Sequence, residues 1–339
     1  MARAPDNSVA SVGEFALIDR LRRLVPTRGR GVTVGLGDDA AVLSFAGPVL
    51  ATCDIQVEGV HFTWDLCTAE DVGWRAVAVN LSDIAAMGGT PRFILISMAL
   101  QPTTSVARVE EMYRGIAEIA RAYEVVIAGG NLSSTPGPLV VDVTALGDAG
   151  RALTRAGARP GDRVWVTGTV GKGAAGRFLA QHPAVRVPGR EALVAAYCRP
   201  TPRVDAGRTL GGVSDVSAMI DTSDGTAGDL LHLAEASGVG VRLEMDRLPA
   251  PPGLVEAARE AGEDPEAWTL AGGEDYELLF TAGAAFDTQA PGLAARLTVP
   301  LTRIGEILSA TEGCWISERG ARRRPLAVQG WDHFPRGRG

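Results

Sequence analysis

The feature that most constrains this chain is a series of carboxylates, each set in a Gly/Ser turn that follows an apolar run. The acids in these turns are Asp38, Asp39, Asp54, Asp83, Asp221, Asp224, Glu274 and Asp275. Turns that close strands present polar groups on a rigid scaffold, so these acids are predicted to converge. Two like charges about 4 Å apart repel by about 4 kcal/mol at an effective dielectric of about 20, so the cluster requires a cation.

Oxygen-only ligands favour Mg²⁺, which in proteins commonly carries substrate phosphates, and phosphoryl transfer is the first hypothesis. Any one of these aspartates, taken alone, is more typical of a helix N-cap or a turn. The recurrence of the pattern, rather than any single member, favours metal binding. Asp38 is the weakest candidate ligand because it is equally suited to capping the next turn.

Length and net charge exclude further classes of function. The chain has 339 residues, enough for two ordinary domains, and its net charge of −7 argues against a nucleic-acid or membrane-surface role. Residues 1–11 contain no apolar leader, and no apolar run reaches the length of a membrane span, so a cytoplasmic protein is expected.

The cysteines form no Cys-x-x-Cys pair and are predicted to be reduced, mostly buried thiols: Cys53, Cys67, Cys198 and Cys314. The histidine spacing does not suggest zinc.

Lys172 is the only lysine in the chain. P-loop enzymes and protein kinases both depend on a lysine that reaches the phosphates, so the chain is predicted to belong to neither class. We expect metal, arginine and backbone N–H groups to bind phosphate, and we expect replacement of Lys172 by alanine to be nearly silent.

The periodicity of apolar residues predicts an α+β chain in two halves. The predicted helices of the first half are 13–25, 69–87 and 105–123, and its strands are 32–36, 48–54, 93–100, 125–128 and 139–146. The predicted helices of the second half are 173–181, 191–197, 204–210 and 227–236. Its strands are 163–167, 217–220, 239–245, 277–281 and 304–307, with a terminal hairpin over 314–324. The turn signal Arg159-Pro160-Gly161 favours domains over 13–150 and 151–335, with a site in the cleft between them.

Two segments imitate dinucleotide-binding turns. Gly35-Leu36-Gly37-Asp38-Asp39-Ala40 would oppose a pyrophosphate with two aspartates. Gly171-Lys172-Gly173-Ala174-Ala175-Gly176 fits G-x-G-x-x-G, but no strand ending in an acid follows about 20 residues later. We interpret the second segment as a tight strand-to-helix turn, with cofactor binding as the alternative.

Six motifs and the C-terminal segment of the chain resemble those of a known family. The motifs are Gly37-Asp38-Asp39-Ala40-Ala41, Val57-Glu58-Gly59-Val60-His61-Phe62, Asn80-Leu81-Ser82-Asp83, Arg151-Ala152-Leu153-Thr154-Arg155, Asp221-Thr222-Ser223-Asp224-Gly225 and Gly272-Gly273-Glu274-Asp275-Tyr276-Glu277-Leu278. Together with the Gly330-Trp331-Asp332 ending they resemble the thiamine-monophosphate kinase family, in order and over almost the whole chain. The resemblance implies an aminoimidazole ribonucleotide synthetase-like, two-domain α+β (α/β sandwich) fold, with an N-terminal mixed sheet and a C-terminal α/β domain.

The same resemblance implies transfer of the ATP γ-phosphoryl group to thiamine monophosphate, with no covalent nucleophile. Several Mg²⁺ ions would be held by Asp39, Thr52, Cys53, Asp54, Asp83, Asn131, Asp221 and Asp224. ATP would be contacted by Arg155, Ser223 and the turn at Gly130 and Asn131, and the thiamine phosphate by His61, Glu274 and Trp331. A homodimer is implied on the same ground.

Simpler interpretations remain open for three of these residues: His61 and Trp331 as packed side chains, and Glu274 as a turn acid. The chain also departs from the family pattern, because many relatives carry Asp in place of Asn131 and Thr in place of Cys53. An Asn oxygen brings no charge, so one metal site would be weaker.

The rival families fit less well. Selenophosphate synthetase would need a cysteine or lysine before Gly37, and hydrogenase maturation factor HypE would need a C-terminal cysteine. A metal-binding protein without catalysis is the alternative from another functional class, and Mg²⁺-dependent nucleotide binding would distinguish it.

Overall fold

The structure, a computed structural model, describes residues 7–35, 40–318 and 323–327. The chain divides into two compact units. The first unit comprises Met1–Ala85, Gly89–Gly150 and Cys198–Val204, and the second comprises Ala86–Gly88, Arg151–Tyr197 and Asp205–Gly339. Among the described residues, no helix is both long and apolar enough to cross a bilayer.

The first unit is built on a four-stranded mixed sheet of order β3-β6-β4-β5. Its strands are β3 (Val49–Val57), β4 (Thr90–Leu100), β5 (Val126–Ser134) and β6 (Val140–Asp148). Its helices are α1 (Val9–Val12), α2 (Glu14–Arg22), α3 (Ala69–Ala86) and α4 (Val106–Ala122), and a small hairpin is formed by β1 (Val32–Val34) and β2 (Val42–Leu43). Only β4 and β5 pair in parallel, with α4 as their crossover.

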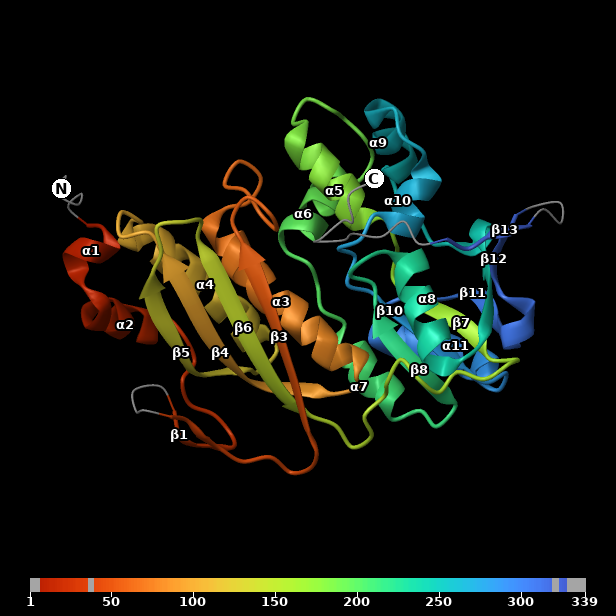
Figure 1. The fold of residues 1–339 in the computed structure, drawn as a ribbon, viewed down its shortest axis with the longest axis horizontal. Coiled ribbons are helices and arrows are strands. Elements are labelled where there is room, and N and C mark those ends of the chain that lie inside the picture. Colours follow the sequence, from red (N-terminus) through yellow and green to blue (C-terminus); the bar gives the residue numbers. More distant parts are fainter. Residues whose placement is uncertain (1–6, 36–39, 319–322, 328–339) are drawn as a thin grey trace, which may run out of the picture. The chain divides into compact units, whose positions relative to one another are not determined.

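The two faces of this sheet differ in environment. Along β6 the residues alternate between buried and half-buried, as expected for a strand with one covered face. Helices α3 and α4 lie together on the covered face (Figure 1). We call the other side the open face; it exposes Val49 and Ile55 of β3, and the β1–β2 hairpin covers one end of it through Phe45, whose ring lies 5.3 Å from that of Phe93.

Helices α3 and α4 approach each other closely because each places a glycine at the crossing. A methyl group added at Gly73 would lie 1.9 Å from the carbonyl oxygen of Met112, and one added at Gly115 would lie 1.9 Å from that of Glu70. Any larger side chain at either position would therefore force the helices apart.

The second unit contains a seven-stranded mixed sheet of order β13-β12-β9-β11-β7-β10-β8. Its strands are β7 (Arg163–Thr167), β8 (Val216–Asp221), β9 (Gly240–Glu244), β10 (Leu278–Ala282), β11 (Leu301–Leu308), β12 (Cys314–Ser317) and β13 (Arg323–Pro325). Its α-helices are α5 (Lys172–Gln181), α6 (Arg190–Cys198), α7 (Val204–Gly211), α8 (Thr226–Ser237), α9 (Leu254–Ala261), α10 (Pro265–Ala271) and α11 (Phe286–Leu297). Two 3₁₀ turns cover Met245–Arg247 and Ala310–Glu312.

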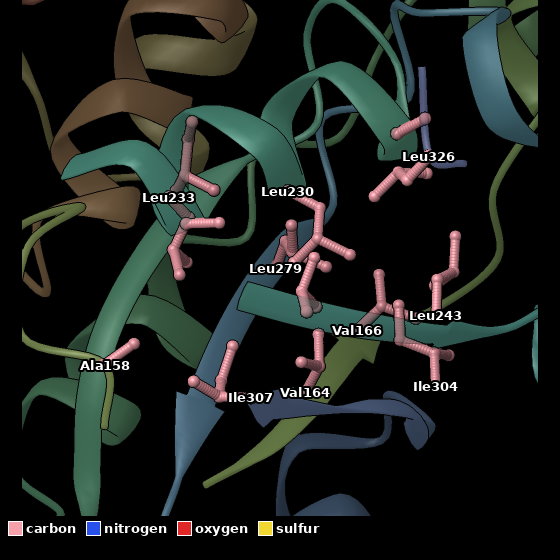
Figure 2. Packing of buried hydrophobic residues seen from close by; sticks show 14 of the residues in the cluster. Ala158, Val164, Val166, Leu230, Leu233, Leu243, Leu279, Ile304, Ile307 and Leu326 are labelled. Atoms are coloured by element: carbon pink, nitrogen blue, oxygen red, sulfur yellow. The ribbon is translucent and has the colours of Figure 1, made fainter. Parts of the chain in front are cut away.

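Both faces of this sheet are covered. Figure 2 shows one core, in which Val164, Val166 and Leu279 of the sheet meet Leu230 and Leu233 of α8. On the other face the ring of Phe286, from α11, packs edge-on against those of Trp165 and Phe280. Helices α5, α6, α9 and α10 share a smaller core of their own.

A short segment, Cys198–Val204, leaves α6 and packs on the first unit. The carbonyl of Pro200 accepts a hydrogen bond from the Trp74 indole at 2.8 Å, and Arg199 pairs with Asp71 of α3. The sulfur atoms of Cys198 and Cys67 lie 3.8 Å apart and are buried. All four cysteines are free thiols; Cys67 and Cys198 are buried as predicted, whereas Cys314 is half-buried and Cys53 is exposed.

Most predicted elements are confirmed, but one strand is longer than predicted and several short elements were missed. The strand predicted over 125–128 continues to Ser134, so Gly130 and Asn131 lie within a strand rather than in a turn. Four helices, α1, α9, α10 and α11, and the two-residue strand β2 were missed. The first three helices are short, and α11 contains Pro291, a residue that normally ends a helix. The predicted terminal hairpin is present as β12 and β13.

The glycine crossing gives a stability prediction. Gly73→Ala should destabilise the protein by at least about 1–3 kcal/mol, because its methyl group would overlap the α4 backbone. The control is Gly292→Ala in α11, where nothing lies within 4 Å and alanine should stabilise the helix by about 0.5–1 kcal/mol. Thermal denaturation measures both, and equal melting temperatures for the two variants would show that the helices do not touch here.

Candidate functional site

In the first unit, predicted ligands meet between β3 and α3. Thr52 and Asp54 lie on the side of β3 that faces the helices. The Thr52 hydroxyl donates a 2.5 Å hydrogen bond to the Asp83 carboxylate of α3. The backbone N–H of Asp54 donates to the Asn80 side-chain oxygen at 3.1 Å. The Asn-Leu-Ser-Asp motif therefore fixes helix and strand together, with Asp83 at their junction.

Buried polar groups hold this junction in place. Asn80 is fully buried, and its amide group also donates to the carbonyl of Ala76 at 3.0 Å. A buried amide is costly unless it is hydrogen-bonded, so the two bonds of Asn80 fix its orientation. The position of the Asp54 backbone follows from that orientation.

These oxygens suit Mg²⁺, which typically takes one or two protein carboxylates and completes its shell with water and phosphate. Asp54 and Asp83 supply carboxylates, and Thr52 supplies a hydroxyl that already contacts one of them. Within the described residues, no group of three or more His, Cys, Asp or Glu side chains is arranged to hold a metal ion. A metal ion bound at this junction would therefore take most of its ligands from water and phosphate.

The structure does not bring the Cys53 side chain to this junction. Cys53 faces the open side of the sheet, where its thiol donates to the Asp142 carboxylate at 3.0 Å and accepts from the Thr144 hydroxyl at 3.6 Å. The hydrogen bond to Asp142 raises the pKa of the Cys53 thiol. Sequence reasoning overlooked Asp142, although it occupies an outward position in the alternating β6 pattern.

Gly130 and Asn131 lie on the opposite edge strand, β5. Asn131 pairs with Ser97, which pairs in turn with Asp142, so these residues share the open face. A methyl group added to Gly130 would lie 2.0 Å from the carbonyl oxygen of Ile96, which explains the glycine. Both residues line a cavity of about 1050 Å³ that is bounded by α2, the β1–β2 hairpin and β5.

His61 follows β3 in a compact turn. Its Nδ1 accepts the backbone N–H of Val57 at 3.0 Å, which sets the tautomer with the proton on Nε2. Phe62 beside it is buried and its ring packs edge-on against Trp64 at 5.1 Å. The turn is therefore rigid, as a substrate-binding residue requires.

In the second unit, two predicted motifs meet through backbone hydrogen bonds. The N–H of Glu274 donates to the carbonyl of Ser223 at 2.7 Å, and the N–H groups of Asp275 and Tyr276 donate to the carbonyl of Thr222 at 3.1 and 2.9 Å. The turn just before β10 is thus fastened to the end of β8. Ser223, predicted to contact ATP, and Glu274, predicted to contact thiamine phosphate, are neighbours.

Negative charge is concentrated where β8 gives way to α8. Asp221 ends the strand, and Asp229, buried in the first turns of the helix, accepts the N–H of Gly225 at 3.1 Å. Burial, followed by the charges of Asp221 and Asp224, raises the pKa of Asp229 to about 8. Sequence reasoning overlooked Asp229, whose five-residue spacing from Asp224 was the available signal. A bound cation would relieve this repulsion.

The remaining predicted residues are placed as follows. Arg155 is exposed, and its neighbour Thr154 accepts the N–H of Met219 in β8 at 3.0 Å, so the Arg155 segment borders the strand that ends at Asp221. Asp38, Asp39 and Trp331 lie outside the described residues.

The glycine-rich turn at Gly171 is confirmed as a strand-to-helix turn. Gly171 caps α5 with a φ of 87°, a left-handed conformation that favours glycine. The structure argues against the expectation that Lys172 is dispensable, because its side chain is buried and forms an ion pair with Glu277, which is fully buried. Removing one partner of such a pair is strongly destabilising.

Comparison with known proteins follows the same division of the chain. Residues 37–149 match the family described as AIR synthase related protein, N-terminal domain, and residues 159–313 match its C-terminal domain. Thiamine-monophosphate kinase of Bacillus subtilis (strain 168) is 36% identical over 310 residues, covering 89% of this chain and 94% of that protein. The Escherichia coli (strain K12) enzyme is 35% identical over 327 residues, covering 95% and 98%.

The chain belongs to the thiamine-monophosphate kinase family. Among solved structures, the family member from Stenotrophomonas maltophilia superposes with a TM-score of 0.80 at 37% identity, over 90% of this chain and 96% of that one. The structure described as AaThiL complexed with AMPPCP and TMP gives a TM-score of 0.76 at 33% identity, over 95% and 97%. The predicted two-domain α+β fold of this superfamily is confirmed. Escherichia coli HypE, at 18% identity, shares the fold.

The β3–α3 junction predicts which charges matter in a thiamine-monophosphate kinase of this sequence. Asp54→Asn and Asp83→Asn should each lower kcat/KM by at least about 100-fold, since each removes charge that would bind metal and offset phosphate. Glu111→Gln, an exposed acid of α4, should change activity less than about twofold. Steady-state kinetics and circular dichroism of all three variants test this, and full activity in Asp83→Asn would exclude the junction as a metal site.

Proposed function

We propose that this protein transfers the γ-phosphoryl group of ATP to thiamine monophosphate, forming thiamine diphosphate and ADP in a Mg²⁺-dependent reaction. The observation that carries the proposal is the match to thiamine-monophosphate kinases over nearly the full length of both chains. A structural relative of the same family was solved with AMPPCP and TMP, an ATP analogue and the proposed acceptor. The arrangement of acids in each unit supports it.

Two sets of residues would hold Mg²⁺. In the first unit these are Asp54, Asp83 and the hydroxyl of Thr52, and in the second they are Asp221 and Asp224. Mg²⁺, when bound, neutralises phosphate charge and orients the transferring oxygens. Asp39, Cys53 and Asn131 remain proposed ligands from the sequence resemblance, Cys53 only through its backbone carbonyl.

The protein's own groups would orient the two substrates. Ser223 and Arg155 border the end of β8 in the second unit and would contact ATP. Gly130 and Asn131, on β5 of the first unit, remain proposed ATP contacts from the sequence resemblance. The Glu274 carboxylate would attract the cationic thiazolium ring, and His61 and Trp331 remain proposed contacts of thiamine monophosphate from the sequence resemblance. In-line transfer between phosphate oxygens needs positioning and charge neutralisation, so no residue is proposed as a nucleophile.

A homodimer in the cytoplasm completes the proposal. The open face of the first unit exposes Val49 at 50% and Ile55 at 47% beside the polar groups of Cys53, Asp142 and Asn131. Apolar side chains on an uncovered sheet face are typical of a surface that a second copy covers. Analytical ultracentrifugation at micromolar protein measures the assembly state directly.

The direct test is product analysis after incubation with ATP, Mg²⁺ and thiamine monophosphate. Thiamine diphosphate and ADP should form in equal amounts, and a chelator should stop the reaction. Free thiamine should be a poor acceptor because it lacks the phosphate oxygen. Nucleotide binding without thiamine diphosphate, under any divalent ion, would instead favour a metal-binding protein without this activity.

Asn131 allows a test of the metal requirement. If its side-chain oxygen helps hold Mg²⁺ on the nucleotide, Asn131→Asp adds a charge and should lower the Mg²⁺ concentration for half-maximal activity, whereas Asn131→Ala should raise it. Titrating activity against Mg²⁺ at fixed ATP measures both. Unchanged metal dependence in both variants would restrict Asn131 to shaping the strand.

A further inference from the structure

The only lysine of the chain is buried at the start of α5, where it cannot serve as a surface charge. The Lys172 ammonium pairs with the Glu277 carboxylate, and the other oxygen of Glu277 accepts the Thr167 hydroxyl at 2.6 Å. Thr167 in turn accepts the N–H of Leu278 at 2.9 Å. Glu277, just before β10, is therefore held from two sides by buried groups.

The same helix also holds the residue two positions earlier. The Asp275 carboxylate accepts the N–H of Gly171 at 2.6 Å and that of Gly173 at 2.9 Å, at the positive end of α5. A methyl group on Gly173 would lie 2.4 Å from the carbonyl oxygen of Gly273. The glycines of the dinucleotide-like motif thus let the helix touch the backbone of the turn, and this protein group, rather than a pyrophosphate, occupies the helix N-terminus.

The turn that contains Asp275 and precedes Glu277 has an unfavourable backbone conformation. Glu274 has a φ of 58° and Tyr276 a φ of 51°, in the left-handed region that non-glycine residues rarely adopt. Such conformations persist where the surroundings determine them, and they concentrate at functional sites. Asp275 lies between the two strained residues and Glu277 directly follows them, so α5 restrains both.

A buried ion pair is weak evidence for a stabilising role, since desolvation of the two charges can exceed their attraction. Its geometric effect is clearer here, because the pair joins the first residue of α5 to the residue just before β10. A Cβ on Gly168 would lie 2.3 Å from the Glu277 carboxylate, so the chain leaves room for this acid at a position with a φ of 56°. Glycine at position 168 therefore leaves the space that the Glu277 carboxylate needs in this position.

We propose that Lys172 is a positioning residue: by fixing Glu277 it holds the Glu274 turn in the conformation that presents the Glu274 carboxylate to thiamine monophosphate. The inference rests on the proposed function, in which Glu274 contacts that substrate. Lys172 itself contacts neither substrate. Its effect should therefore appear on the acceptor side of the reaction and only while Glu274 is present.

The experiment compares Lys172→Met with a matched core variant, Ile307→Ala. Ile307 is buried in β11 of the same unit, and its truncation should lower the melting temperature without touching the turn. Lys172→Met should raise the KM for thiamine monophosphate at least about tenfold and the KM for ATP less than about threefold. Ile307→Ala should leave both KM values within about twofold at a temperature where it is folded.

A double-mutant cycle with Glu274→Gln isolates the coupling. If Lys172 acts through Glu274, Lys172→Met should change the KM for thiamine monophosphate less than about twofold in the Glu274→Gln background. Thr167→Val, which nearly preserves side-chain shape and removes the second restraint on Glu277, should shift the same KM in the same direction. It keeps the inference testable should Lys172→Met fail to fold.

Three results would overturn the inference: KM values for Lys172→Met that match those of Ile307→Ala, a preferential rise in the KM for ATP, or additive effects with Glu274→Gln. The second result would instead make the Gly171 turn a phosphate site. Wild-type protein that forms no thiamine diphosphate would refute the proposed function itself. Active wild type with an unchanged acceptor KM in both Lys172→Met and Thr167→Val would refute only the role of Lys172.

Discussion

Convergence of carboxylates, at the end of β8 in the second unit and between the middle of β3 and α3 in the first, is the constraint on which both candidate sites depend. In the second unit, Asp221 and Asp224 lie close enough to Asp229 to contribute, after burial, to a pKa of about 8 for that acid. In the first unit, the Asp83 carboxylate accepts a hydrogen bond from the neutral hydroxyl of Thr52. A bound cation would offset the repulsion between these acids, and Mg²⁺ carrying substrate phosphates is the cation that the proposed function would supply.

Rigidity around these acids comes from buried polar groups more than from the apolar cores. Asn80 fixes the backbone of Asp54, and the backbone of Thr222 and Ser223 accepts three N–H groups from the turn that contains Glu274. Each of these groups would lose a hydrogen bond if the site shifted, and an unpaired buried group is costly. Side chains proposed for substrate binding are thereby held by the scaffold in each unit before any ligand arrives.

The sequence was sufficient for the elements whose signal is local. Apolar periodicity located α3 and most strands, and the turn acids identified Asp54, Asp83, Asp221 and Asp224 as candidates. It was insufficient where the decisive property is which face a residue occupies. Cys53 and Asp54 are adjacent in sequence yet point to opposite sides of the sheet, and the burial of Lys172 depends on an acid 105 positions away. The spacing of apolar residues within one helix or strand contains no information about contacts over such separations.

The geometry of the open face provides a physical argument about assembly. Cys53 and Asn131 are on this face, but β3 and β5 are the two edge strands of a four-stranded sheet, roughly 14 Å apart at about 4.8 Å per strand. Mg²⁺ binds its ligands at about 2.1 Å, so one copy cannot bring both residues to the same ion. If both are ligands, as the family resemblance implies, they serve different ions or meet across two copies. The exposed apolar residues that flank Cys53 on β3, Ile55 and Val49, would suit the second arrangement, because apolar side chains on an exposed sheet face are typical of a surface that another copy covers.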